Sequence, residues 1–106
     1  MGIDSVKLLR EEFIGIGEVS GYRFTRYAYN DHAYVYRVEV DGIDSGYHHW
    51  EVFERRVNDV YGCEKYPKSK AFGEWAFTYR SFELDLAMSK FEELTRRCLS
   101  RIEDRG

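Results

Sequence analysis

Three features are scarce in this chain of 106 residues, and each shortage excludes a class of protein. Its two cysteines, Cys63 and Cys98, lack CxxC spacing, so we expect reduced thiols rather than a disulfide scaffold. No apolar run exceeds four residues, which excludes a membrane-spanning segment, and a single proline leaves no proline-rich linker. Residues 1–16 include three acids, unlike a signal peptide, so we expect a cytoplasmic protein without membrane contact.

What the chain does contain is the composition of one folded domain, residues 1–106, with 43% hydrophobic and 33% charged residues. The formal net charge of −3 lacks the basic footprint of a strong nucleic-acid binder. The charge is uneven, because residues 1–54 carry five basic and ten acidic side chains, whereas residues 55–106 carry eleven and nine. The two halves could therefore meet different partners, although a solvated surface with random asymmetry is the favoured explanation.

The strongest pattern is at the C-terminal end, where apolar residues recur at helical spacing over residues 82–103. Acids lie near the start of this segment and arginines near its end, which complements the helix dipole. The pattern predicts a long amphipathic helix that packs on a sheet. Phe82 and Leu86 point away from its apolar face, so they are either covered by the loop 66–73 or part of an interface such as a two-fold dimer.

Aromatic and β-branched residues predict five strands before this helix. In the first of them the alternation changes phase between Phe24 and Tyr27, which indicates a bulge or a strand buried on both faces. Residues 4–14 carry apolar side chains at helical spacing and predict a short N-terminal helix. The predicted strands are residues 18–30, 33–41, 47–57, 60–66 and 74–79.

The predicted fold is therefore α+β, with a five-stranded antiparallel sheet, the long C-terminal helix on one sheet face and a short N-terminal helix. One helix covers only one face, yet large rings occur on both parities of the strands. The second face is then either covered by the N-terminal helix and long loops, or exposed as an aromatic platform that binds bases or a protein.

No motif in the sequence specifies catalysis, a metal or a cofactor. The run of glycines at residues 15–21 lacks the third glycine of the dinucleotide-binding fingerprint, and a strand follows it where the fingerprint needs a helix. His48 and His49 are adjacent on a predicted strand and point to opposite faces, so they cannot bind one metal ion together. We expect no cofactor, no metal and no catalytic residue.

Residues 66–79, with the later Lys90-Phe91-Glu92-Glu93-Leu94, resemble small bacterial proteins carried on phages and conjugative elements. The resemblance implies an accessory protein. Some accessory proteins of this kind block host defence systems by binding them. The strands followed by Ala87-x-x-x-Phe91 are also similar to the WGR domain of poly-ADP-ribose polymerases. The Trp-Gly-Arg motif itself is absent, with residues 51–55 in the comparable strand, so DNA binding is not carried over.

The excess of aromatic residues without a catalytic motif favours a non-enzymatic protein-binding domain, such as an inhibitor or host-defence antagonist from a mobile element. Its partner would be a protein, with a homodimer as a further option. The alternative is a weak single-stranded nucleic-acid binder that stacks bases on aromatic rings beside Arg and Lys, which the net charge disfavours. The candidate partner-binding residues are Tyr27, Tyr29, Arg55, Arg56, Tyr66, Lys68, Lys70, Phe82 and Leu86.

Overall fold

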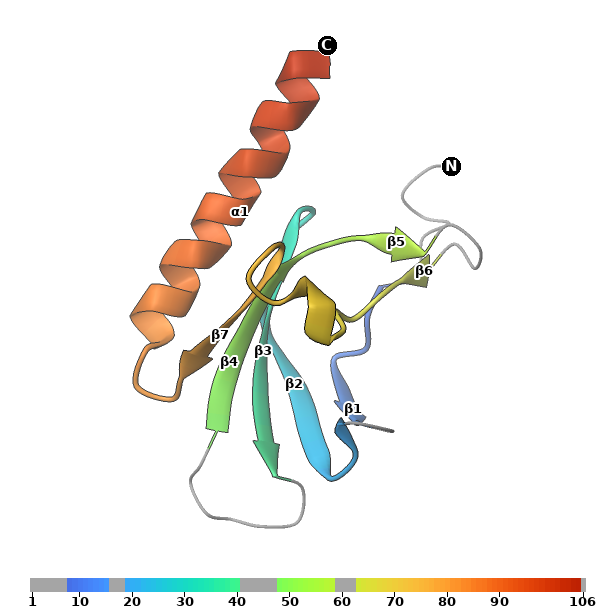
Figure 1. Cartoon of the computed structure of the whole chain (residues 1–106), viewed down its shortest axis with the longest axis vertical. Coiled ribbons are helices and arrows are strands. Elements are labelled where there is room, and N and C mark those ends of the chain that lie inside the picture. The colour runs from blue at the N-terminus through green and yellow to red at the C-terminus, as the bar shows by residue number, and fades with distance from the viewer. Residues whose placement is uncertain (1–7, 16–18, 41–47, 59–62, 106) are drawn as a thin grey trace.

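An antiparallel sheet of five strands forms the middle of the molecule, with a helix on one face and an irregular segment on the other (Figure 1). The structure is a computed structural model and describes residues 8–15, 19–40, 48–58 and 63–105, with residues 57, 58, 63 and 101–105 described by backbone alone. The elements are β1 (Glu12–Ile14), β2 (Tyr22–Tyr29), β3 (Ala33–Val40), β4 (His48–Glu54), β5 (Val57–Asn58), β6 (Cys63–Glu64), the 3₁₀ turn η3 (Ser69–Ala71), β7 (Ala76–Arg80) and α1 (Leu84–Arg105).

The sheet has the strand order β1-β2-β3-β4-β7, and every neighbouring pair is antiparallel. The chain passes through β1 to β4 as a meander, leaves the sheet, and returns as β7 on the far edge beside β4. The predicted five-stranded antiparallel sheet with a C-terminal helix is confirmed, but the N-terminal helix is not seen in the described ranges, and the strand predicted over residues 60–66 is found only in part and outside this sheet.

The described part of residues 4–14 does not form the predicted N-terminal helix. Residues 4–7 lie outside the described ranges, residues 8–10 are irregular, and residues 12–14 form β1. Phe13 pairs with Phe24 across the two strands, and their rings stack with centroids 4.8 Å apart. This cross-strand contact buries Phe13 against the sheet and outweighs the local helical spacing.

The strand predicted over residues 60–66 is present only at residues 63–64 of its described part, and it does not belong to the main sheet. Residues 60–62 lie outside the described ranges, and Cys63–Glu64 (β6) pairs with β5 in a separate two-stranded ribbon. The chain from residue 63 to residue 75, which we call the strap, then crosses the face of the sheet (Figure 1). Its aromatic residues are used to cover that face rather than to extend the sheet.

A bulge in β2 confirms one of the two explanations for the change of phase. The pairing of β2 with β3 shifts between Arg26 and Ala28, so Tyr27 has no partner in the register. Tyr27 contacts Trp50 on the helix side at a ring-centroid distance of 4.9 Å, whereas Tyr29 is paired with Tyr34 on the strap side. The bulge therefore separates Tyr27 and Tyr29 onto opposite faces.

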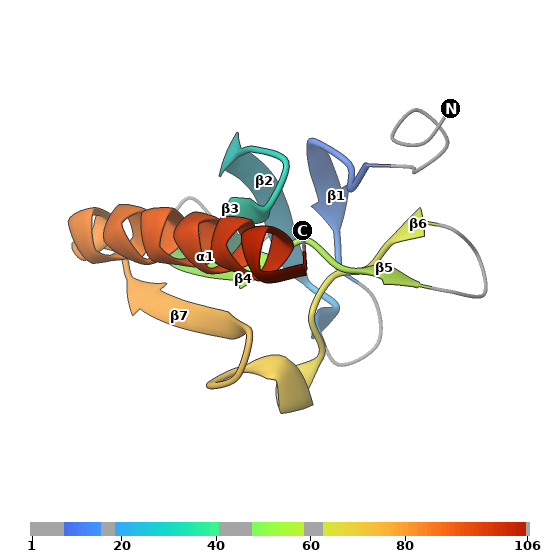
Figure 2. The same ribbon diagram turned by 90° about the horizontal axis from the view of Figure 1, so that it is seen from above.

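The helix α1 lies along β3, β4 and β7, and its C-terminal turns extend beyond the ends of the strands (Figures 1 and 2). Ala87 and Leu94 are fully buried between the helix and Val35, Val52 and Trp50 of the sheet. Leu99, further along the helix, is 45% exposed. No helix in the described ranges has the length and apolarity to cross a membrane.

The opposite face is covered by the strap and by residues before and within β1. Tyr34, Tyr36 and Phe53 on this face have no exposed surface, and Tyr66, Phe72 and Trp75 of the strap pack against them together with Leu9 and Phe13. These three sheet rings are therefore covered by other parts of the chain and do not form an exposed aromatic platform.

Candidate binding cleft

The strap does not cover its sheet face completely, and a cleft of about 950 Å³ remains beside it. One wall is the strap, and the other is the connection between β1 and β2 at Gly15 and Val19. The floor is the sheet face itself, formed by residues of β1, β2, β4 and β7. The described lining residues are Phe13, Gly15, Val19, Phe24, Glu51, Tyr66, Pro67, Lys68, Ser69, Lys70, Phe72 and Thr78.

Aromatic rings fix the apolar part of the cleft. Phe13 and Phe24 stack on the floor, and the Tyr66 ring meets both of them edge-on at centroid distances of 5.6 Å and 5.1 Å. Offset-stacked and edge-on pairs are the favoured aromatic geometries, so each ring holds the others in place. The apolar floor is thus formed before any ligand arrives.

One carboxylate lies among these rings. Glu51 occupies the strap-side parity of β4, between Phe53 and His49, and its side chain is only 14% exposed. The Tyr66 hydroxyl donates to Glu51 Oε1 at 2.5 Å, and His49 Nε2 is 2.8 Å from Glu51 Oε2. Burial raises the pKa of the Tyr66 hydroxyl, and the charge and hydrogen bond of Glu51 raise it further, so Tyr66 stays a donor.

The rim of the cleft is positively charged. Lys68, Ser69 and Lys70 are all exposed at the start of η3. Within the described ranges neither lysine has an ion-pair partner, in contrast to most of the arginines. The rim therefore presents two cations that a bound group can neutralise.

The wall at the β1–β2 connection requires a glycine. The Gly15 N–H donates to the Tyr22 carbonyl at 2.8 Å, and a Cβ at residue 15 would collide with the Val19 carbonyl oxygen and lie 3.0 Å from the Phe24 ring. Past this wall the apolar surface continues. Val19 in the wall is 44% exposed, and beyond it Tyr22 and Val40 are 39% and 36% exposed, and this pair shares the face of Phe24.

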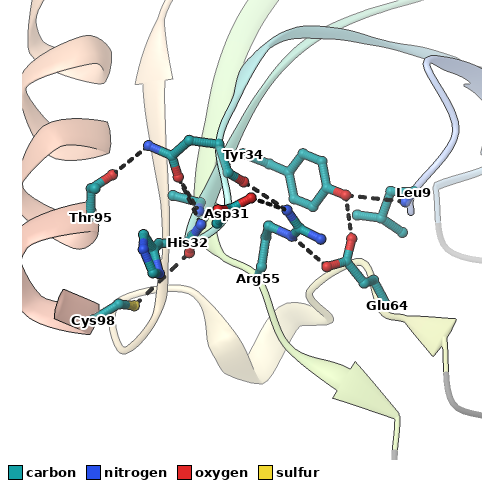
Figure 3. A network of polar contacts seen from close by, with 10 residues as sticks. Leu9, Asp31, His32, Tyr34, Arg55, Glu64, Thr95 and Cys98 are labelled. Atoms are coloured by element: carbon teal, nitrogen blue, oxygen red, sulfur yellow. Dashed lines mark hydrogen bonds and ion pairs between the residues drawn. The ribbon is translucent and has the colours of Figure 1, made fainter. Parts of the chain in front are cut away.

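At the start of the strap, two residues before Tyr66, a buried ion pair fastens the strap to the sheet (Figure 3). Glu64 is 7% exposed and accepts hydrogen bonds from the Tyr34 hydroxyl and from Arg55 Nε. The Tyr34 oxygen in turn accepts the Leu9 N–H at 3.2 Å, which draws in the segment before β1. Arg55 is 11% exposed at its side chain, so this pair is shielded from water.

The same network reaches the helix. Arg55 Nη1 donates to the Asn30 carbonyl at 2.8 Å and lies 3.9 Å from Asp31 Oδ1. The Asn30 side chain accepts the His32 N–H at 2.7 Å and donates to the Thr95 hydroxyl on α1 at 2.9 Å. A continuous series of polar contacts thus connects the strap, the sheet and the helix. These contacts stabilise the fold and do not form a site open to a ligand.

Three of the residues proposed from the sequence meet at the cleft, namely Tyr66 in its wall and Lys68 and Lys70 on its rim. Tyr27 and Tyr29 are 52% and 47% exposed but lie on opposite faces of the sheet. They do not form one surface with each other.

The other four lie elsewhere. Arg55 is held in the buried pair with Glu64, and Arg56 bonds Glu54 at 3.1 Å and lies over the Trp75 ring. Phe82 and Leu86, at the start of the helix, are 75% and 49% exposed and are not covered by the strap, which lies on the opposite face. The structure does not bring them to the cleft.

Glu51, Phe13 and Phe24 were missed as site residues by sequence reasoning. A signal for Glu51 exists, because it shares the parity of the buried Phe53 in a strand whose other parity holds Trp50 and Val52. A charged residue on the buried face of a strand needs an interaction partner or serves a function. Nothing in the local sequence indicates that Phe13 and Phe24 meet.

In the parts of the chain that are described, no three His, Cys, Asp or Glu side chains gather closely enough to hold a metal ion. Comparison with known proteins found no matching family model and no similar curated protein or solved structure. A function for this chain therefore has to be inferred from the cleft itself, and the resemblances noted in the sequence stay predictions.

Removal of Arg55 should test the tie between strap and sheet. Arg55→Met leaves the Glu64 carboxylate buried without its cation, and we expect a loss of about 3–5 kcal/mol in the free energy of unfolding. The exposed pair of Arg97 with Glu93 provides the control, since Arg97→Met should cost less than about 1 kcal/mol. Chemical denaturation measures both, and equal losses would contradict a buried tie.

The buried tyrosines should make the fold sensitive to alkali. Burial, followed by the hydrogen bond to Glu64, raises the pKa of Tyr34 to about 12 from its usual 10.0, and burial also raises the pKa of Tyr36 and Tyr66. The unfolded chain then loses these protons at lower pH than the folded chain does, so stability falls as the pH rises from 10.0 towards about 12.

Denaturation curves across this pH range test the effect. Tyr34→Phe removes one of the raised groups, so its stability should fall less steeply with pH than that of the unaltered chain, whatever its stability at neutral pH. An identical slope in the two proteins would show that Tyr34 loses its proton with equal ease in the folded and unfolded states.

Proposed function

We propose that this chain is a non-enzymatic protein-binding domain that receives an extended segment of a partner protein in the cleft between the strap and the β1–β2 connection. The observation that carries the proposal is the continuity of the apolar surface. The aromatic floor does not end at the cleft, because Tyr22 and Val40, each more than a third exposed, continue the face of Phe24 beyond it. A small ligand needs only the cleft, whereas a polypeptide segment uses the cleft and the surface beyond it.

The cleft is also suited to binding at low entropic cost. Its floor lies on strands β1, β2, β4 and β7 of one hydrogen-bonded sheet, and its rings hold one another. The strap is fixed at its start by Glu64 and Tyr66, and at its end the Trp75 carbonyl accepts the Glu54 N–H at 3.1 Å. A surface that is already ordered loses little conformational freedom when a partner docks. An accessory or inhibitor role on a mobile element would be carried out through this same surface.

The contacts disfavour the nucleic-acid alternative. Of the four cations considered for phosphate contact, Arg55 and Arg56 already bond carboxylates, which leaves Lys68 and Lys70. The sheet rings Tyr34, Tyr36 and Phe53, which an aromatic platform would offer to bases, have no exposed surface.

A displayed library of random peptides, selected on the immobilised domain, tests the proposal. Thr78 is exposed and lines the cleft, so Thr78→Trp should fill it and weaken selected peptides at least about tenfold. Arg80→Trp is the matched control, because Arg80 is exposed two residues further along the same strand and does not line the cleft.

The proposal predicts enriched peptides that bind the unaltered domain and the Arg80→Trp variant with equal affinity, as measured by calorimetry. If no peptide is enriched, or if Thr78→Trp binds them as well as the unaltered domain does, the cleft is not a protein-binding site.

A further inference from the structure

We infer that the segment received by the cleft is acidic and is anchored by a side chain that is both aromatic and a hydrogen-bond donor, that is, tryptophan or tyrosine. This inference rests on the proposed function and adds the chemistry of the partner. Three features of the cleft, namely its carboxylate, its rings and its rim, each select one property of that segment.

The carboxylate selects a donor. Glu51 accepts one hydrogen bond from Tyr66 and has one contact to His49, so each of its two oxygens retains capacity for a further hydrogen bond. A purely apolar side chain packed into the cleft would displace water from a carboxylate oxygen of Glu51 without replacing the lost hydrogen bond. The unpaired oxygen would make the binding free energy less favourable. An anchor with an N–H or O–H at its edge supplies the missing bond.

The rings select a flat, apolar anchor. Phe13, Phe24, Tyr66 and Phe72 surround the space that Glu51 faces. An aromatic anchor buries a large area against them with few rotatable bonds, and edge-on contacts suit its geometry. Serine or asparagine would satisfy Glu51 but leave the rings in water, and only tryptophan and tyrosine combine both properties.

The rim selects acidic neighbours. Lys68 and Lys70 stand at the mouth of the cleft without ion-pair partners in the described ranges, so residues on either side of the anchor pass close to two cations. The chain as a whole has a net charge of −3. Screening limits exposed charges to a range of about 8–10 Å at ordinary salt, so the local lysines outweigh the distant acids. The same cations exclude an arginine or lysine anchor for Glu51.

Synthetic peptides of nine residues test each property by calorimetry on the intact chain. The reference peptide has a central tryptophan flanked by glutamates. In the second peptide naphthylalanine replaces tryptophan and keeps the two fused rings without the N–H, and in the third lysines replace the glutamates. We expect the second to bind about tenfold more weakly than the first, and the third to show no measurable binding.

Variants of the chain assign these effects to residues. In Glu51→Gln the penalty for naphthylalanine should shrink to about threefold or less, because the acceptor has lost its charge. Lys70→Glu should weaken the acidic peptide about tenfold. Arg96→Glu, an exposed site on α1 with the same change in net charge, should leave the affinity unaltered.

The outcomes separate this inference from the proposed function. If library peptides bind in a manner that Thr78→Trp abolishes, but tryptophan and naphthylalanine bind equally and Lys70→Glu has no effect, the cleft binds protein and the chemistry inferred for the segment is wrong. If the Thr78→Trp test itself fails, both are wrong. Tighter binding of the lysine-flanked peptide would also overturn the inference.

Discussion

Two hydrogen bonds from tyrosine to carboxylate hold the strap on the sheet, and the second face of the sheet depends on them. Tyr34 of the sheet donates to Glu64 of the strap, and Tyr66 of the strap donates to Glu51 of the sheet. A buried carboxylate is unfavourable unless hydrogen bonds and opposite charge compensate it, and Arg55 supplies that charge to Glu64. Both bonds lie within the first four residues of the strap, so this end cannot leave the sheet without leaving a buried polar group unpaired. At the other end of the strap, the Trp75 carbonyl accepts the Glu54 N–H of β4 at 3.1 Å.

The cleft is a consequence of this fixation. Among the described residues, α1 covers one face of a sheet that is apolar on both sides, and the mostly irregular strap covers the other. An irregular segment cannot fill a sheet face as evenly as a helix does, so the gap beside it remains as a cleft. Because Tyr66 belongs both to the fixation and to the wall, the contact that stabilises the fold also positions Glu51 for a ligand.

Much of the fold could be predicted from the sequence where one local pattern dominates. The alternation of residues 33–41 and the apolar arc of residues 82–103 gave β3 and α1 nearly to the residue, and the change of phase in β2 indicated its bulge. The helical spacing that includes Leu9 and Phe13 was misleading. Both residues pack against the sheet, so their spacing does not reflect one face of a helix. The site was harder to predict, since the Tyr34–Glu64 contact spans 30 positions and no local period encodes it.

Native-state hydrogen exchange tests the central claim, that the strap is part of the folded core and not a loop lying on it. The backbone N–H groups of Lys65, Gly73 and Trp75 are hydrogen-bonded within or beside the strap. If the strap is held as described, these groups should exchange with an opening free energy close to that of the Val35 and Val52 amides in the middle of the sheet. Exchange of the strap amides through a separate opening, at a free energy far below that of the sheet, would contradict a fixed strap and the preformed cleft that it borders.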